Sequence, residues 1–300
     1  MFLQMMGALQ LGFLYALMAV GVYVTFRILD LPDLTVDGSF TFGMAAAAMI
    51  TTAGHPVLAL LIGMLAGAAA GLVTGFLQTK MSIAPILSGI LTMTGLYTIN
   101  LFVMGERSNI ALTTNETVFT LFDKLSPMPD AVNKLIVAVA LCVLVIAVLA
   151  VFFHTRMGIA IRATGDNEEM VRSSSINANM AKCVGIGLCN GCVGLSGAAI
   201  CQYQLFSDVS FGTGMVVIGL ASVIIGEAVM GRRSVTVGLI SACVGSVIYR
   251  LIIAIALKFE IFPASALKLI SSAIVVIALA MPKLKGTYQN LKAKRGSKHE

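Results

Sequence analysis

Nine long apolar runs constrain the fold of this chain more than any other feature of its sequence. They cover residues 7–27, 38–53, 56–79, 83–104, 131–153, 181–204, 213–230, 235–257 and 263–281. The second run is short and closely follows Asp30, Pro32 and Asp33, so a broken or re-entrant helix is the alternative to a full span there. Because a helix crosses a bilayer with about 20 mostly apolar residues, we expect an all-α polytopic membrane protein with about 8–9 transmembrane helices.

The composition agrees with a membrane protein and excludes several other classes. Of the 300 residues, 58% are hydrophobic and 11% are charged, whereas soluble domains carry about 25% charged residues. A soluble globule of this length could not bury so much apolar surface. The net charge of +6 is accounted for by membrane topology, so we expect no nucleic-acid partner.

Lysine and arginine collect on one side of the membrane if the nine runs alternate in direction. That side holds Lys80, Arg156, Arg162, Arg172, Lys182, Arg232, Arg233, Lys283, Lys285, Lys292, Lys294, Arg295 and Lys298. The opposite loops hold only Arg107, Lys124, Lys134 and Lys258. Because positive charges favour the cytoplasmic side, we expect the first side and the C-terminus to be cytoplasmic.

This topology divides the chain into a transmembrane domain over residues 1–282 and a basic cytoplasmic tail over residues 283–300. Residues 155–180 are then a cytoplasmic loop and residues 105–130 an external loop. The tail is expected to be attracted to anionic membrane lipid. Nine alternating spans place the N-terminus outside, whereas a re-entrant second run places it inside.

The sequence points to no metal, cofactor or catalytic centre. The six cysteines lie in apolar runs, where cysteine packs as a small hydrophobic residue. Cys189 and Cys192 have CxxC spacing but no further ligand nearby, so packing is favoured over zinc chemistry. No acid–base pair is apparent and no GxxxxGK[ST] phosphate loop is present. We therefore expect the chain not to be an enzyme.

Glycines recur at four-residue spacing in the third run, at Gly63, Gly67, Gly71 and Gly75. Four residues return nearly to the same face of a helix, so one side of this helix is smooth. Gly187 and Gly191 belong to a second such stripe in the sixth run. Small residues allow close helix packing in membranes, so we expect these helices inside a bundle or at a subunit interface, as fixed contacts or as sliding surfaces.

Polar residues precede and open the second run, at Asp33, Thr35, Asp37 and Ser39. Carboxylates this close to a span are costly unless they face water, a partner or protein. Two interpretations stay open. The side chains cap the following helix and make structural hydrogen bonds, or they line a path for a solute. Asn100 and Gln202 are each expected to make interhelical hydrogen bonds, and Asn100 is also a candidate for the solute path.

The cytoplasmic loop contains the pattern of a short amphipathic helix. Asp166 is the expected N-cap, and Glu169 three residues later has capping-box spacing. Glu168, Glu169 and Arg172 fit the first turns. We expect either a docking element for another protein or a solvated interfacial turn.

Several residues of this loop form a recognisable set, namely Gly158, Arg162, Ala163, Asp166, Asn167, Ile176 and Asn177. The set resembles the coupling loop of ABC importer permeases of the branched-chain amino acid and ribose transporter superfamily. Residues 33–40, 108–110, 202–204 and 219–227 narrow the resemblance to an uncharacterised tryptophan/tyrosine transport permease group. One departure stands out. The loop has Ser173, Ser174 and Ser175 where this family usually carries Ala, a bulky apolar residue and Gly.

The resemblance implies a role for the chain and for particular residues. Two copies would form the transmembrane pathway in a bacterial inner membrane, with Asp33, Thr35, Asp37, Ser39 and Asn100 as candidate pathway residues. Separate cytoplasmic ABC ATPase subunits would dock on the loop, and an extracytoplasmic lipoprotein would deliver an amino acid or related small solute. The docking residues would be Gly158, Arg162, Ala163, Asp166, Asn167, Glu168, Glu169, Ile176 and Asn177. The alternative is an ion-coupled secondary transporter or channel that acts without an ATPase.

Overall fold

The computed structural model describes residues 2–231, 233–258 and 276. Its helices are α1 (Phe2–Tyr23), the π-helical turn η1 (Val24–Ile28), α2 (Thr35–Thr52), α3 (Pro56–Thr79), α4 (Pro85–Val103), α5 (Val118–Leu125), α6 (Asp130–Phe152), α7 (Arg156–Asp166), α8 (Glu168–Ser173), α9 (Ala178–Gln204), α10 (Met215–Met230) and α11 (Val235–Lys258). Two short strands, β1 (Asn109–Ala111) and β2 (Phe206–Asp208), pair antiparallel with Ile110 opposite Ser207. The described part of the chain is therefore mainly helical, as expected.

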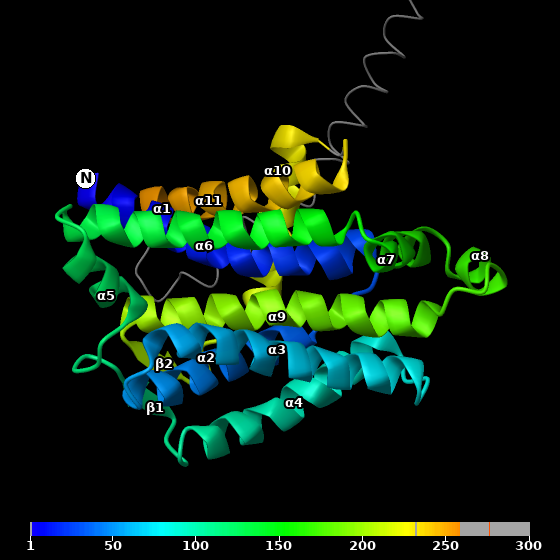
Figure 1. Cartoon of the computed structure of the whole chain (residues 1–300), viewed down its shortest axis with the longest axis horizontal. Coiled ribbons are helices and arrows are strands. Elements are labelled where there is room, and N and C mark those ends of the chain that lie inside the picture. Colours follow the sequence, from blue (N-terminus) through cyan, green and yellow to red (C-terminus); the bar gives the residue numbers. More distant parts are fainter. Residues whose placement is uncertain (1, 232, 259–275, 277–300) are drawn as a thin grey trace, which may run out of the picture.

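The long helices form a bundle built around α9. This helix packs against α2 and α3 on one side and against α1 on the other. In Figure 1, α5, the two strands and the start of α1 lie at one end of the bundle, and α7 and α8 lie at the opposite end. The predicted external loop and the predicted cytoplasmic loop are thus at opposite ends.

Local sequence signals set several helix ends. Pro56 and Pro85 begin α3 and α4, where proline costs nothing because the first amides of a helix have no intrahelical partner. Gly231 follows α10 with φ +76°, a conformation that glycine adopts without steric cost. The helix interiors themselves are apolar nearly all round, which is typical of helices surrounded by lipid and protein.

Six helices among the described residues are long and apolar enough to cross a membrane. They are Gln4–Ile28, Pro56–Thr79, Pro85–Val103, Asp130–Phe152, Ala178–Gln204 and Val235–Leu257. The second and seventh runs also form helices, α2 and the shorter α10, but these are not among the six. The ninth run lies outside the described residues apart from residue 276. The structure thus supports a multi-pass helical membrane protein with six candidate spans among the described residues, and the predicted 8–9 spans are not confirmed.

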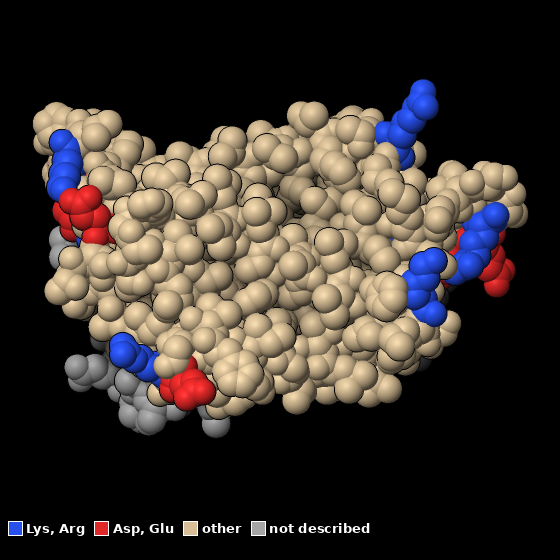
Figure 2. Space-filling view, turned by 60° about the horizontal axis from the view of Figure 1, so that its bottom comes forward, with Lys and Arg blue, Asp and Glu red and all other residues tan. Residues whose placement is uncertain are grey.

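The lateral surface of the bundle has the character of a lipid-facing surface. Figure 2 shows charged side chains gathered towards the ends of the molecule, with a broad uncharged region between them. Apolar side chains on α4 and α6, such as Phe102 and Val151, are exposed. Exposed apolar surface of this extent is unfavourable in water but not in lipid.

The second segment is not broken inside its helix. α2 runs without interruption from Thr35 to Thr52, and the irregular residues 29–34 come before it. Asp30 has φ +53° in this connection. The chain therefore leaves η1 at the end that carries α7 and turns back before α2 begins, which brings Asp33 and Thr35 into the bundle.

Candidate functional site

A closed polar cluster surrounds the start of α2. The Asp33 carboxylate accepts hydrogen bonds from the Thr35 backbone N–H at 2.9 Å and from Asn190 Nδ2 at 2.7 Å. The hydroxyl of Ser39 donates to Asn190 Oδ1 at 2.6 Å. These four residues are buried, so the cluster joins α2 to the middle of α9.

A chain of threonine hydroxyls extends this cluster to two further helices. Thr35 Oγ1 lies 2.8 Å from Thr74 Oγ1 on α3, which donates to Thr92 Oγ1 on α4 at 2.9 Å. All three side chains are buried. Because Asp33, Thr35 and Ser39 find their partners within the chain, their geometry favours the structural interpretation over direct contact with a solute.

Asp37 has a different role, because it caps the N-terminus of α10. Its Oδ2 accepts from the Gly214 N–H and its Oδ1 from the Val216 N–H, both at 2.8 Å. The first amides of a helix have no intrahelical acceptor and carry partial positive charge. One carboxylate on α2 thereby fixes where α10 begins.

Asp37 also lines a small cavity of about 160 Å³ between α2, α4 and the loop before α10. The polar residues of its lining are Asp37, Thr41, Thr94, Tyr97, Asn100 and Thr213. Asn100 is 1% exposed and its Oδ1 has no hydrogen-bond partner among the described residues. The expected interhelical hydrogen bond of Asn100 is therefore absent from the described part. The structure separates the five predicted pathway residues into a closed cluster and this cavity.

Gln202 makes the interhelical hydrogen bonds that were predicted for it. Its Nε2 donates to the Pro56 carbonyl at 2.8 Å, and its Oε1 accepts from the Val118 N–H at 2.9 Å. These bonds tie the end of α9 to the starts of α3 and α5. The prediction for Gln202 is confirmed.

The glycine stripe of α3 lies against α9. A Cβ added at Gly67 would lie 2.9 Å from Gly194 Cα, and one at Gly71 would lie 2.6 Å from the Ile186 carbonyl oxygen. Gly63 faces Ala198 and Gly75 faces Cys183 in the same way. In the second stripe, Gly187 and Gly191 face Leu72 and Ala68 of α3 at 3.1 Å or more. The α3–α9 contact is thus a close approach of two backbones.

The predicted cytoplasmic loop forms two short helices, and their boundary lies one residue later than predicted. Asp166 ends α7, and Asn167 is the N-cap of α8 through a 3.0 Å bond from the Met170 N–H to Asn167 Oδ1. The assignment of Asp166 as the cap is therefore wrong. Asn177 caps α9 similarly, by accepting from the Met180 N–H at 3.0 Å.

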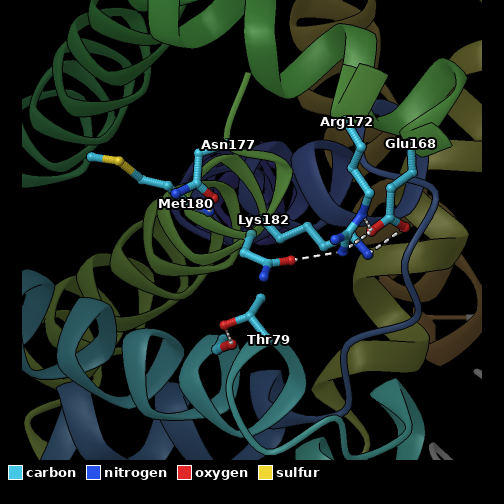
Figure 3. Close-up of polar contacts among 8 residues, drawn as sticks. Thr79, Glu168, Arg172, Asn177, Met180 and Lys182 are labelled. Atoms are coloured by element: carbon cyan, nitrogen blue, oxygen red, sulfur yellow. Dashed lines mark hydrogen bonds and ion pairs between the residues drawn. The ribbon is translucent and has the colours of Figure 1, made fainter. Parts of the chain in front are cut away.

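Glu168 is the electrostatic centre of the α8 region (Figure 3). Its carboxylate accepts from Lys182 Nζ at 2.6 Å and from Arg172 at 2.8 Å. The bond from Lys182, reinforced by Arg172, lowers the pKa of Glu168 below its usual value. Arg172 also donates to Asn179 Oδ1 at 2.9 Å, so this ion-pair network fastens α8 to the first turns of α9.

The remaining predicted loop residues divide into buried contacts and exposed groups. Gly158 lies against the backbone of Phe153, where a side chain would not fit. Arg162 and Asp166 line a cavity of about 320 Å³ at the end of η1, beside an ion pair of 2.7 Å between Arg27 and Glu227. Ala163 is half-buried, while Glu169 and Ile176 are exposed.

Two partners in these sites were not identified from the sequence. Asn190 lies in the Gly-rich stretch of the sixth run and was not predicted as a site residue. A lone amide at the middle of a span is nevertheless a signal for a buried hydrogen bond. The Arg27–Glu227 pair joins residues 200 positions apart. Opposite charges at the same membrane depth are the only sequence signal for such a pair.

Comparison with known proteins identifies the family. Residues 4–279 match the model for the branched-chain amino acid transport system permease component. The chain belongs to this permease family. It is 36% identical over 280 residues to the tyrosine transport system permease protein of Clostridioides difficile (strain R20291), an alignment that covers 93% of this chain and 91% of that protein.

More distant relatives agree with this assignment. The permease is 26% identical over 213 residues to the ribose import permease protein of Escherichia coli (strain K12), covering 70% of this chain and 65% of that protein. It is also 27% identical to an uncharacterised protein of Rickettsia prowazekii (strain Madrid E), covering 92% and 96% of the two chains. No solved structure matches the chain significantly. The protein is thus a permease component of an ABC-type transport system.

Proposed function

We propose that two copies of this permease form the pathway of an ATP-driven importer in a bacterial cell membrane. ATP hydrolysis takes place on separate cytoplasmic subunits, and an extracytoplasmic lipoprotein delivers the solute. Amino acids are the proposed cargo class, because the relative with 36% identity is a tyrosine transport system permease protein. L-Tyrosine is accordingly the first solute to test.

The observation that carries this proposal is the surface formed by α7, α8 and residues 174–180, which we call the docking surface. Ile159 is 55% exposed and Met170 is 52% exposed. Met180 and Ile176 expose apolar side chains at the same end of the bundle. Apolar side chains beside charged residues at a membrane–water boundary are suited to docking another protein.

The docking surface is also rigidly attached to the bundle. A Cβ on Gly165 of α7 would overlap the Ile28 carbonyl oxygen of η1, and Ile161 is fully buried. Lys182 and Glu168 fix α8 to α9. A movement imposed on α7 and α8 by an ATPase would therefore be passed to η1 and α9, because close-packed contacts transmit displacement.

The exposed polar face of α4 supports a pathway between two copies. Thr94, Tyr97 and Thr98 are exposed on this helix although it is long and apolar enough to span a membrane. Polar groups at membrane depth normally face protein or a water-filled cavity. A second copy opposite α4 would place these groups in such a pathway. In the proposed topology, α7, α8 and the C-terminal tail all lie on the cytoplasmic side.

Co-purification tests the docking surface directly. The permease is co-expressed with its ATPase subunit, and the variants Ile159→Glu and Met170→Glu are compared with Leu125→Glu. Leu125 is 84% exposed on α5 at the opposite end of the bundle. We expect the α7 and α8 variants to lower ATPase recovery by roughly tenfold, as for a central contact of an interface. Leu125→Glu should recover as much ATPase as the unmodified chain, and equal recovery with all three variants would refute the docking surface.

A further inference from the structure

The cavity beside Asp37 presents a carboxylate together with two hydroxyl groups whose hydrogens are already used. Thr41 Oγ1 donates its hydrogen to the Asp37 carbonyl oxygen at 3.1 Å, and Thr94 Oγ1 donates to the Ile90 carbonyl oxygen at 2.8 Å. A hydroxyl group has one hydrogen and two lone pairs. Both hydroxyls have therefore used their hydrogens within the helices, and they offer only acceptor lone pairs to the cavity.

The Asp37 carboxylate keeps acceptor capacity while it caps α10. Each of its oxygens accepts one backbone N–H, from Gly214 or from Val216. An ionised carboxylate has about four lone-pair sites, so each oxygen has room for another donor. Within the described residues, no lysine, arginine or histidine lines the cavity.

Asn100 and Tyr97 complete this arrangement. The Asn100 side chain is almost wholly buried, lines the cavity and has no partner for its Oδ1 in the part of the chain that the structure covers. A buried acceptor without a donor is unfavourable. Rotation of the Asn100 amide about its last torsion exchanges the positions of Oδ1 and Nδ2, so the oxygen can also take the place that the nitrogen holds. Tyr97 is 55% exposed beside the cavity, and an aromatic face attracts cations.

We propose that this cavity receives the ammonium group of the solute that the permease transports. A volume of about 160 Å³ is smaller than the roughly 300 Å³ of a typical ligand pocket, so only one end of the solute enters it. The rest of the solute lies along the exposed face of α4 around Tyr97. This inference rests on the proposed function, and it assigns the class of group that contacts Asp37 and Asn100.

Charged thiol reagents test the chemistry of the cavity without requiring transport. Thr94→Cys is introduced into a chain whose six native cysteines are replaced by alanine. Its reaction with aminoethyl methanethiosulfonate, an ammonium reagent, is compared with that of sulfonatoethyl methanethiosulfonate, an anionic reagent. Thr98→Cys is the matched control, because Thr98 is exposed on the same helix but is not part of the cavity lining.

The rate ratio of the ammonium reagent to the sulfonate reagent is the measured quantity. We expect this ratio to be roughly tenfold larger at position 94 than at position 98, because the carboxylate attracts the cation and repels the anion. Asp37→Asn in the Thr94→Cys chain should remove most of the difference. Equal ratios at the two positions, or a difference that Asp37→Asn does not change, would overturn the proposal. The comparison of positions 94 and 98 stands even if Asp37→Asn weakens the capping of α10.

Protection of Thr94→Cys from the thiol reagents by small compounds tests this inference separately from the proposed function. Tyramine keeps the ammonium group of tyrosine, and 3-(4-hydroxyphenyl)propionate lacks it. Tyramine should slow the modification of Thr94→Cys at least about threefold, and the propionate should not. Equal protection by both compounds would contradict an ammonium site. Failure of the complete transport system to move L-tyrosine would instead contradict the proposed cargo and leave the thiol result unaffected.

Discussion

Asn190 Nδ2 donates a 2.7 Å hydrogen bond to Asp33 Oδ2, and the two residues are 157 positions apart. The bond joins the middle of α9 to the irregular segment that precedes α2. Asn190 Oδ1 accepts in turn from Ser39 on α2. Because a buried carboxylate is tolerated only with polar partners, this pair determines how the chain re-enters the bundle after η1.

Removal of the Asn190 amide should destabilise the bundle. Asn190→Leu leaves the buried Asp33 Oδ2 without its donor, which costs about 1–3 kcal/mol. The expected result is a lower midpoint of thermal unfolding for the detergent-solubilised protein. Asn179→Leu on the same helix is the control, because Asn179 is only half-buried and bonds to the exposed Arg172. Equal midpoints for the two variants would show that the Asp33 bond does not stabilise the fold.

The close approach of α3 and α9 predicts opposite effects of two glycine substitutions. A Cβ at Gly67 would overlap the Asn190 carbonyl oxygen and lie 2.9 Å from Gly194 Cα, whereas a Cβ at Gly95 on α4 meets nothing within 4 Å. Gly67→Ala should destabilise by about 1–3 kcal/mol, as for other overpacked sites. Gly95→Ala should be neutral or stabilise by up to about 1 kcal/mol, since alanine favours the helix. Size-exclusion profiles and unfolding midpoints measure both effects, and a tolerated Gly67→Ala would contradict the backbone contact.

The Glu168 network predicts a pH-dependent attachment of α8. The pKa of Glu168 is lowered in the folded protein from its usual value of 4.5. The contribution of Glu168 to stability is therefore fully present above pH 4.5 and is lost as the pH falls through the lower folded pKa. Because the side chain is 35% exposed, solvent screening limits the effect to about 1 kcal/mol or less. Hydrogen exchange of residues 168–173, corrected for intrinsic rates, should rise on acidification. Glu168→Gln should remove this acid-dependent step, and an unchanged step in that variant would assign it to another group.

The sequence predicted features that depend on neighbouring residues and missed those that depend on distant ones. The four-residue spacing of Gly63 to Gly75 indicated a smooth helix face, but α9 as its partner is a property of the folded bundle. Asp33 and Asp37 looked equivalent in sequence. In the structure one bonds to Asn190 and the other caps α10, because the start of α10 is brought to α2 only by the path of residues 205–214.

The boundary between α7 and α8, in the predicted cytoplasmic loop, shows a smaller limit of sequence-based prediction. Asp166 and Asn167 are both good N-cap residues, and local sequence does not separate them. The choice depends on where α7 ends, and α7 extends to Asp166. The shift makes Glu168 the first residue of α8 instead of the second, and its carboxylate accepts a hydrogen bond from Lys182.

The central claim is that this permease is a pathway driven by a separate ATPase. Uptake into liposomes tests this claim most directly. The purified chain is reconstituted alone and together with its ATPase subunits and binding protein, and the uptake of radiolabelled L-tyrosine is measured with and without ATP. We predict no uptake above empty liposomes for the chain alone, with or without an ion gradient, and ATP-dependent uptake for the complete system. Rapid uptake by liposomes that contain only this chain would contradict the account.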